Sequence, residues 1–400
     1  MTRPHGYPRI RSLDNLLICR DVPQRTIAEF DAKMYGLDGI GPRRRERTRT
    51  VSKGKDARPA KPATLREVAE AVGCSVATVS RVLAGDRPVG PDLARRVQDA
   101  ARELGYLPNQ VARALRSRST ATVGLVIPQI TNPFFPALMR EVEHALHDQG
   151  RALLLADSAD SAELEAERVE LLIARQVDGL IVAPVDQERS VPTLVKAAAR
   201  VPVVLLDRSV EVQADAVTVD NAAGMRLLLE HLRGLGHSRF WFLGAAGDSS
   251  AAVERRAAFQ EWAVRHAAFW RVELGDFSTD FGRYSAARAV TATAAQRPDA
   301  LVCANDLIAA GAVLRLRELG VSVPEELAVS GFDDVDLASL TAPRLTTVHQ
   351  PYRELAAEAA RMLTARIAQP DAAARTVRLA PTLVARGSTV ALENPQGSKP

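Results

Sequence analysis

From residue 121 onward, short runs of Val, Leu and Ile alternate with longer amphipathic segments, and this alternation restricts the fold more than any other feature. The apolar runs predict strands at residues 123–127, 152–155, 179–182, 203–206, 216–219, 240–243, 300–302 and 327–330. Helices are predicted at residues 135–149, 162–175, 222–235, 249–267, 282–296, 306–319 and 352–367. Strands that alternate with helices form parallel sheets covered on both faces. The pattern predicts an α/β core of two doubly wound parallel-sheet lobes, with a ligand cleft at the carboxyl ends of the strands.

Three short helices are predicted upstream of this core. Thr64 and Glu67 have the spacing of a capping box, and Gly73 stands where the end of a helix favours positive φ. Ser75 can cap the second helix, and Pro91 is a favoured first residue for the third. The segment therefore predicts an N-terminal all-α helix-turn-helix domain.

The second of these helices, residues 76–83, keeps small and polar side chains on its outer side. Val76, Ala77, Ser80 and Arg81 fall on or near the exposed face. A helix that reads the major groove of DNA needs such a face. The alternative is a three-helix structural module that makes no contact with DNA.

A series of short motifs runs along most of the chain. They are Ala-Thr-Val-Ser-Arg-Val-Leu at 77–83, Gly-Tyr-Leu-Pro-Asn-Gln-Val-Ala-Arg-Ala-Leu at 105–115, Thr-Val-Gly-Leu-Val-Ile-Pro at 122–128, Asn-Pro-Phe-Phe at 132–135, Val-Asp-Gly-Leu-Ile-Val at 177–182, Gly-His-Ser-Arg at 236–239, Ala-Asn-Asp at 304–306, Gly-Phe-Asp-Asp at 331–334 and Leu-Thr-Thr-Val-His-Gln-Pro at 345–351. In order and spacing they resemble the lactose-repressor/galactose-repressor family of bacterial transcriptional regulators. The resemblance implies a periplasmic-binding-protein-like core whose chain crosses between lobes near Asn221, near His349 and near residue 380.

For DNA contact, the resemblance implies that Val76 and Ala77 open the recognition helix and that Arg81 lies one turn further on. Small apolar side chains can touch thymine methyl groups, and an arginine can donate two hydrogen bonds to a guanine. Phosphate contacts suit the nearby hydroxyl side chains of Ser75, Thr78 and Ser80. A surface ion pair with Asp86 or Glu70 is the alternative for Arg81.

Residues 109–116 resemble the hinge helix of the family, a short helix that binds the minor groove. The resemblance assigns DNA contacts there to Asn109, Ala112 and Leu115, with Leu115 as a wedge between the central base pairs. An apolar contact with the lobes is the alternative for Leu115. Because a lone helix of this length is unstable in water, we expect it to form when two copies pair on DNA.

Polar and aromatic residues at the ends of predicted strands indicate an effector site between the lobes. The predicted effector-binding residues are Phe134, Phe135, Asp207, Arg255, Phe277, Asn305 and Asp333. The resemblance assigns the ligand-gripping arginine to Arg255. Carboxylate, amide, guanidinium and aromatic groups together suit a polyhydroxylated ligand, because the polar groups can pair with vicinal hydroxyls. The alternatives are that Asp333 caps a helix and that Phe135 belongs to the core.

The sequence departs from the purine-binding members of the family at two positions. Those members carry an arginine where Ser249 stands and a threonine where Ala251 stands. We therefore expect a sugar or sugar derivative as effector. No cofactor and no metal site are expected, because Cys19, Cys74 and Cys303 are too few and too scattered for a metal cluster or a disulfide framework.

Charge is distributed unevenly along the chain. The net charge is +8 over residues 1–63, +3 over residues 64–120 and −7 over residues 121–400. The basic charge lies where DNA would bind, and the acidic body is kept from adhering to it. No apolar run approaches 18 residues, and residues 16–19 are too short for a secretory signal. These features predict a cytoplasmic protein without a membrane partner.

We divide the chain into five parts. They are a basic disordered extension (1–60), the helix-turn-helix domain (61–107), a hinge helix and linker (108–120), a two-lobed effector-binding and dimerisation domain (121–392) and a disordered tail (393–400). The extension is either a real basic arm or precedes a true start at Met34 or Val51.

The predicted function is repression at a palindromic DNA operator by a homodimer, or a tetramer, under the control of a small sugar-like effector. A secreted sugar-binding protein would share the two lobes but not the helix-turn-helix. An enzyme is disfavoured, because the sequence has no G-x-S-x-G, P-loop, strand-following G-x-G-x-x-G or metal-ligand spacing.

Overall fold

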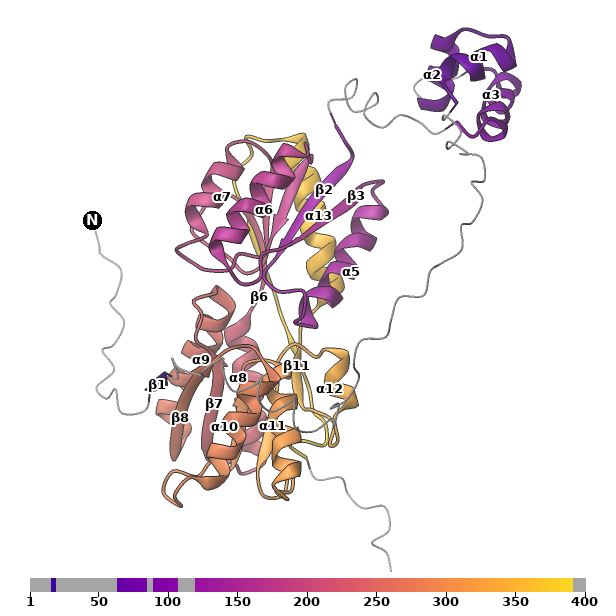
Figure 1. Ribbon diagram of the computed structural model, residues 1–400. Coiled ribbons are helices and arrows are strands. Elements are labelled where there is room, and N and C mark those ends of the chain that lie inside the picture. Colours follow the sequence, from indigo (N-terminus) through magenta and orange to yellow (C-terminus); the bar gives the residue numbers. More distant parts are fainter. Residues whose placement is uncertain (1–15, 19–62, 85–88, 107–118, 391–400) are drawn as a thin grey trace, which may run out of the picture. The chain divides into compact units, whose positions relative to one another are not determined.

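The structure, a computed structural model, describes residues 16–18, 63–84, 89–106 and 119–390 (Figure 1). These residues belong to two units, a small helical unit and a larger two-lobed unit. The predicted hinge helix, most of the N-terminal extension and the tail at 393–400 lie outside the described residues.

The helical unit contains three helices, α1 (Leu65–Val72), α2 (Val76–Ala84) and α3 (Pro91–Glu103). The predicted capping box is formed, because Thr64 accepts a hydrogen bond from the Glu67 amide while the Glu67 carboxylate accepts one from Thr64. Gly73 ends α1 with φ of 73°. Each helix contributes to one small core, in which Val68, Val79 and Val97 are fully buried.

The first lobe is built on a parallel sheet with the strand order β12-β6-β5-β4-β2-β3. The strands are β2 (Thr122–Ile127), β3 (Ala152–Asp157), β4 (Gly179–Val182), β5 (Val203–Asp207), β6 (Asp215–Val219) and β12 (Thr376–Leu379). One face packs against α5 (Phe134–His147) and α13 (Tyr352–Ala368), and the other against α6 (Ala162–Ala174) and α7 (Val191–Ala198). Successive residues of β2 serve both cores, since Leu125 faces the first pair of helices and Val126 the second. Burial on both faces explains the unbroken apolar runs.

The second lobe has the strand order β1-β8-β7-β9-β10, again parallel. The strands are β1 (Leu16–Ile18), β7 (Arg239–Ala245), β8 (Phe269–Gly275), β9 (Ala300–Cys303) and β10 (Ala328–Ser330). Helices α8 (Asn221–Gly234) and α9 (Ser250–His266) cover one face, and α10 (Thr279–Thr291) and α11 (Asp306–Glu318) cover the other. The short helix α12 (Asp336–Leu340) follows β10, and β11 (Thr347–His349) pairs antiparallel with β13 (Thr382–Val384).

The chain passes between the two lobes three times, as predicted. It leaves the first lobe between β6 and α8, returns between β11 and α13, and leaves again between β12 and β13 (Figure 1). The carboxyl ends of strands from both sheets therefore lie beside the crossing segments, where a ligand cleft is expected.

Five of the described strands were not predicted, namely β1, β8, β11, β12 and β13. The run at β8 is interrupted by Arg271 and Glu273, yet Glu273 is fully buried and its carboxylate accepts a 2.8 Å hydrogen bond from Arg288. The expectation that residues 1–60 lack structure is wrong for β1, which pairs in parallel with β8, Leu17 opposite Glu273. An edge strand offers unpaired backbone groups, and a short apolar run of the same chain can pair with them.

Helices α10 and α11 approach so closely that each has a glycine at the contact. A Cβ on Gly282 would lie 2.0 Å from the Ile308 carbonyl oxygen, and a Cβ on Gly311 would lie 2.0 Å from that of Thr279. No helix in the described part of the chain is both long and apolar enough to cross a membrane.

Candidate DNA-reading helix and effector cavity

Helix α2 carries the side chains predicted to read DNA. Ser75, Val76, Ala77 and Arg81 are exposed, whereas Thr78 and Ser80 are half-buried. Val76 is 43% exposed. The Ser75 hydroxyl caps the helix by accepting a 3.1 Å hydrogen bond from the Thr78 amide. The outer face is thus available to a groove while Val79 holds the helix on the core.

Arg81 does not pair with Glu70 among the described residues, so one of the two alternative ion pairs is not formed; Asp86 lies outside them. The three residues assigned to the hinge helix, Asn109, Ala112 and Leu115, also lie outside the described residues. Their roles stay predictions.

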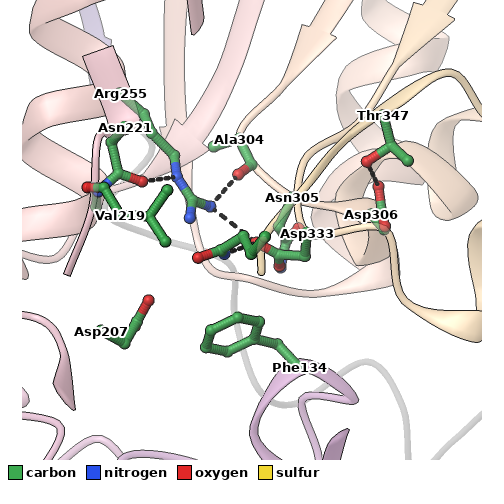
Figure 2. A network of polar contacts seen from close by, with 12 residues as sticks. Phe134, Asp207, Val219, Asn221, Arg255, Ala304, Asn305, Asp306, Asp333 and Thr347 are labelled. Atoms are coloured by element: carbon green, nitrogen blue, oxygen red, sulfur yellow. Dashed lines mark hydrogen bonds and ion pairs between the residues drawn. The ribbon is translucent and has the colours of Figure 1, made fainter. Parts of the chain in front are cut away.

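One cavity between the lobes brings together all seven residues predicted to bind the effector. Figure 2 shows five of them, Phe134, Asp207, Arg255, Asn305 and Asp333. Its wall consists of Asn132, Phe134, Phe135, Asp207, Arg208, Ser249, Ala251, Arg255, Phe277, Asn305, Asp333 and Gln350. Its empty space, part of which is open to solvent, is about 280 Å³.

Arg255 is held rigidly in the cavity wall. Its guanidinium donates hydrogen bonds to the Asn221 side-chain oxygen (2.8 Å), the Ala304 carbonyl (2.8 Å) and Asp333 Oδ1 (3.2 Å) (Figure 2). The same group lies 3.7 Å from the ring centre of Phe332, a cation–π contact. These contacts come from three separate segments, the start of α8, the end of β9 and the loop after β10, and they fix the plane of the guanidinium before any ligand arrives.

Asp333 is almost fully buried at the end of β10. Burial raises the pKa of its carboxyl to about 6, although the Arg255 charge and a hydrogen bond from Gln350 favour the ionised form. Gln350 Nε2 donates that bond over 2.7 Å, and the Tyr352 hydroxyl donates to the Asp333 carbonyl over 2.7 Å. Asp333 also has φ of 109°, an unfavourable conformation for a residue with a side chain. Buried charge and backbone strain together are typical of a functional site.

Asp207 lies across the cavity at the end of β5, also with positive φ (66°). Burial raises the pKa of its carboxyl, and the charges of Arg208 and Arg255 oppose that rise. The cavity therefore contains two carboxylates and two guanidinium groups, a balance that suits an uncharged polar ligand.

Three buried polar atoms in the cavity wall make no hydrogen bond within the described residues. They are Asn305 Nδ2, Gln350 Oε1 and Arg208 Nε. The other end of the Asn305 amide caps α11, since its oxygen accepts a 3.0 Å hydrogen bond from the Ile308 amide. An unpaired buried polar group costs about 1–3 kcal/mol. A ligand that supplied the missing partners would remove that cost.

The alternative for Phe135 is compatible with its cavity position, because the ring lies in the first-lobe core and also forms part of the wall. Asp306 follows β9 beside Asn305 but points elsewhere. Its carboxylate accepts hydrogen bonds from the Thr347 hydroxyl (2.6 Å) and the Val335 amide (2.9 Å), which fixes the loop after β10 (Figure 2).

Sequence reasoning missed Asn132, Arg208 and Gln350 as wall residues. Arg208 directly follows Asp207 at a strand end, the same signal that selected its neighbour. Gln350 follows β11 in the second crossing segment, and Asn132 precedes the two phenylalanines. No group of three or more potential metal ligands occurs within the described residues.

Comparisons with known proteins place this architecture. The description "Bacterial regulatory proteins, lacI family" matches residues 64–109, and "Periplasmic binding protein-like domain" matches residues 229–389. The HTH-type transcriptional repressor PurR of Aliivibrio fischeri (strain MJ11) is 31% identical over 333 residues, covering 82% of this chain and 98% of that repressor. The chain belongs to the lacI family of bacterial regulatory proteins. It is a DNA-binding transcriptional regulator with a helix-turn-helix domain.

Other members of the lacI family support the same assignment. The ribose operon repressor of Escherichia coli (strain K12) is 32% identical over 331 residues, 82% of this chain and 99% of its own length. A crystal structure of the lac repressor dimer bound to operator and the anti-inducer ONPF has a TM-score of 0.74 and 28% identity, covering 83% of this chain and 100% of that one. The predicted fold class and family are confirmed.

Proposed function

We propose that this lacI-family chain is a homodimeric repressor whose operator affinity is set by a small, uncharged, polyhydroxylated effector bound between the two lobes. The main support for the proposed effector is that one cavity brings together seven residues from widely separated positions in the sequence.

The effector class follows from the wall chemistry. Arg255 and Asp333 form a fixed donor–acceptor pair, and the unpaired atoms of Asn305 and Gln350 supply a further donor and acceptor. A sugar offers vicinal hydroxyls that both donate and accept. Phe134 gives the site an apolar ring next to these polar groups, as a sugar face requires.

Sequence identity to the relatives does not identify the effector, because PurR and the ribose operon repressor are about equally similar to this chain, at 31% and 32% identity. The cavity wall is more selective. Ser249 and Ala251 both line it, at the two positions where purine-binding members carry arginine and threonine. A sugar is therefore favoured over a purine.

Closure of the lobes on the ligand would couple ligand binding to DNA binding. Several hydrogen bonds and ion pairs join the lobes at the rim, including Ser209 N to Ser250 Oγ (2.9 Å), Gln187 N to the Asp248 carbonyl (3.1 Å) and Arg378 to Glu254 (3.1 Å). A ligand that favours this closed form shifts the equilibrium by its difference in affinity for the two forms. In a dimer, that shift changes how two DNA-reading helices can engage paired half-sites.

The test begins with genomic DNA fragments selected by the full-length protein. Fluorescence anisotropy with a selected fragment then measures operator affinity while monosaccharides, disaccharides, adenine and hypoxanthine are added one at a time. At least one saccharide is expected to change operator affinity at least fivefold, and the purines should not. A response to purines alone would contradict the proposed effector class; sedimentation of the operator complex as a monomer would contradict the homodimer.

A further inference from the structure

A second, larger hollow adjoins the effector cavity between the loops of the two lobes. It encloses about 730 Å³, including space open to solvent. Three side chains line both spaces, Arg208, Ser249 and Phe277. A ligand bound in the inner cavity can therefore extend past these three residues into the outer hollow.

The outer hollow has an acidic wall. Four aspartates line it, Asp160, Asp186, Asp248 and Asp276. None of these four forms an ion pair with lysine or arginine within 4.0 Å among the described residues. Arg189 also lines the hollow, but its guanidinium pairs with Glu163. Arg208 also lines the hollow and its charge acts on Asp160, so the negative potential of this space comes mainly from Asp186, Asp248 and Asp276.

A buried donor at the junction points to a ligand. Arg208 is 94% buried, and its Nε donates no hydrogen bond because the nearest carboxylate, Asp207, is 3.6 Å away. Its Nη1 donates only a long bond, 3.3 Å, to the Pro184 carbonyl. Ser249, which is 95% buried, accepts a 3.4 Å bond from the Ala252 amide and can still donate its own proton. At the junction, Arg208 Nε and the Ser249 hydroxyl can therefore donate hydrogen bonds to a ligand.

We propose that the effector contains two sugar units, an inner unit held by Arg255 and Asp333 and an uncharged outer unit in the acidic hollow beside Phe277. This proposal rests on the proposed sugar-responsive function and specifies its ligand. The aspartates can each accept hydrogen bonds from hydroxyl groups, and the Phe277 ring offers an apolar face at the junction. The same aspartates repel phosphate or carboxylate substituents on the outer unit.

The test is isothermal titration calorimetry of the full chain at pH 7.5 with matched saccharides. The probes are cellobiose, lactose, maltose, melibiose and trehalose, their component monosaccharides glucose and galactose, ribose, and the 6-phosphate of the best-binding disaccharide. One disaccharide should bind at least tenfold more tightly than every monosaccharide, and its phosphate on the outer unit should weaken binding at least tenfold.

A double variant that removes two negative charges tests whether the hollow causes the discrimination against the phosphorylated disaccharide. In Asp248→Asn/Asp276→Asn, the discrimination against the phosphorylated disaccharide should shrink at least threefold. Asp280→Asn is the matched control, because Asp280 is exposed on α10 next to the hollow but does not line it. Discrimination should stay unchanged in the control.

The outcomes separate this proposal from the broader one. If a monosaccharide binds as tightly as every disaccharide that contains it, the two-unit effector is wrong while the sugar-responsive function stands. Equal binding of the phosphorylated disaccharide to the wild-type protein would overturn the role of the acidic wall. If no saccharide of either length binds, the proposed function fails and this inference fails with it.

Discussion

Asp333 Oδ1 lies 3.2 Å from Arg255 Nη1, and this contact joins the end of β10 to helix α9 inside the effector cavity. Both side chains are about 95% buried. A pair so deeply buried is held by its neighbours as much as by its own attraction, since burial removes the water that would stabilise each charge. Asn221, Gln350 and the Ala304 carbonyl provide those neighbours.

Replacing Arg255 should separate ligand binding from DNA binding. Arg255→Ala removes the central donor of the cavity and leaves the Asp333 carboxylate without its counter-charge. We expect saccharide affinity to fall at least tenfold in calorimetry, while operator affinity without ligand changes less than about threefold. Arg256→Ala is the control, because Arg256 is on the same helix but does not line the cavity. Unchanged saccharide affinity in Arg255→Ala would contradict the assigned site.

The ionisation of Asp333 should appear in the pH dependence of stability. Burial raises its pKa to about 6, whereas the unfolded chain titrates near about 3.9. Between these values the folded protein retains a proton that the unfolded chain has lost, so the contribution of Asp333 to stability falls as pH rises. Asp333→Asn cannot ionise. Relative to the wild type, its free energy of unfolding should therefore rise by on the order of 1–3 kcal/mol between pH 4.5 and 7.

Urea unfolding at several pH values measures this difference. The exposed Asp336 supplies the control, since Asp336→Asn removes a carboxylate three residues further along the chain outside the cavity. The stability difference between Asp333→Asn and the wild type is compared at each pH with that of Asp336→Asn. Parallel curves for Asp333→Asn and the wild type would show that Asp333 titrates normally.

Arg81 is predicted to specify one base pair in each half-site. Arg81→Ala should weaken binding to the selected operator by roughly 1–3 kcal/mol and relax base preference at that position. Arg95→Ala removes the same charge from α3, where Arg95 pairs with Asp92 on the surface. Binding selections with randomised operators check both variants. Equal losses on operator and random DNA would instead make Arg81 a phosphate contact.

The contact between α10 and α11 gives a prediction about stability. Gly311→Ala places a methyl group 2.0 Å from a backbone oxygen of Thr279, so the helices must separate. Overpacking of this kind costs about 1–3 kcal/mol, and backbone atoms yield less readily than side chains. Gly234→Ala, at the end of α8 with nothing within 4 Å of the new Cβ, should be neutral or stabilising by up to about 1 kcal/mol. Chemical denaturation measures both; equal stabilities would contradict the close approach.

The sequence predicted most of the two sheets because their strands are buried on both faces and read as unbroken apolar runs. It could not predict β8, where Arg271 and Glu273 look like surface residues. The buried Glu273 carboxylate accepts a hydrogen bond from Arg288 of α10, and that pairing is visible only after folding. Strand β1 could not be predicted either, because its own sequence does not show that the edge of β8 is available for pairing.

The residues of the cavity wall were likewise predicted only in part from the sequence. Asp207 and Asn305 follow strands, so the parallel-sheet rule selected them without any coordinates. Gln350 escaped notice because it lies in a crossing segment, where no rule for strand ends applies. The order of the two residues in the sequence does not show which of Asn305 and Asp306 faces the cavity. In the structure Asn305 lines it, whereas Asp306 accepts a hydrogen bond from Thr347.

Thermodynamic reciprocity tests the central claim, that the ligand in this cavity controls DNA binding. Calorimetry would measure the affinity of the best-binding saccharide for the free protein and for the saturated operator complex, and anisotropy would measure operator affinity with and without that saccharide. If one equilibrium links the two sites, both ratios must be the same factor, which we expect to be at least fivefold. A saccharide that binds with identical affinity to the free protein and the operator complex would contradict the account.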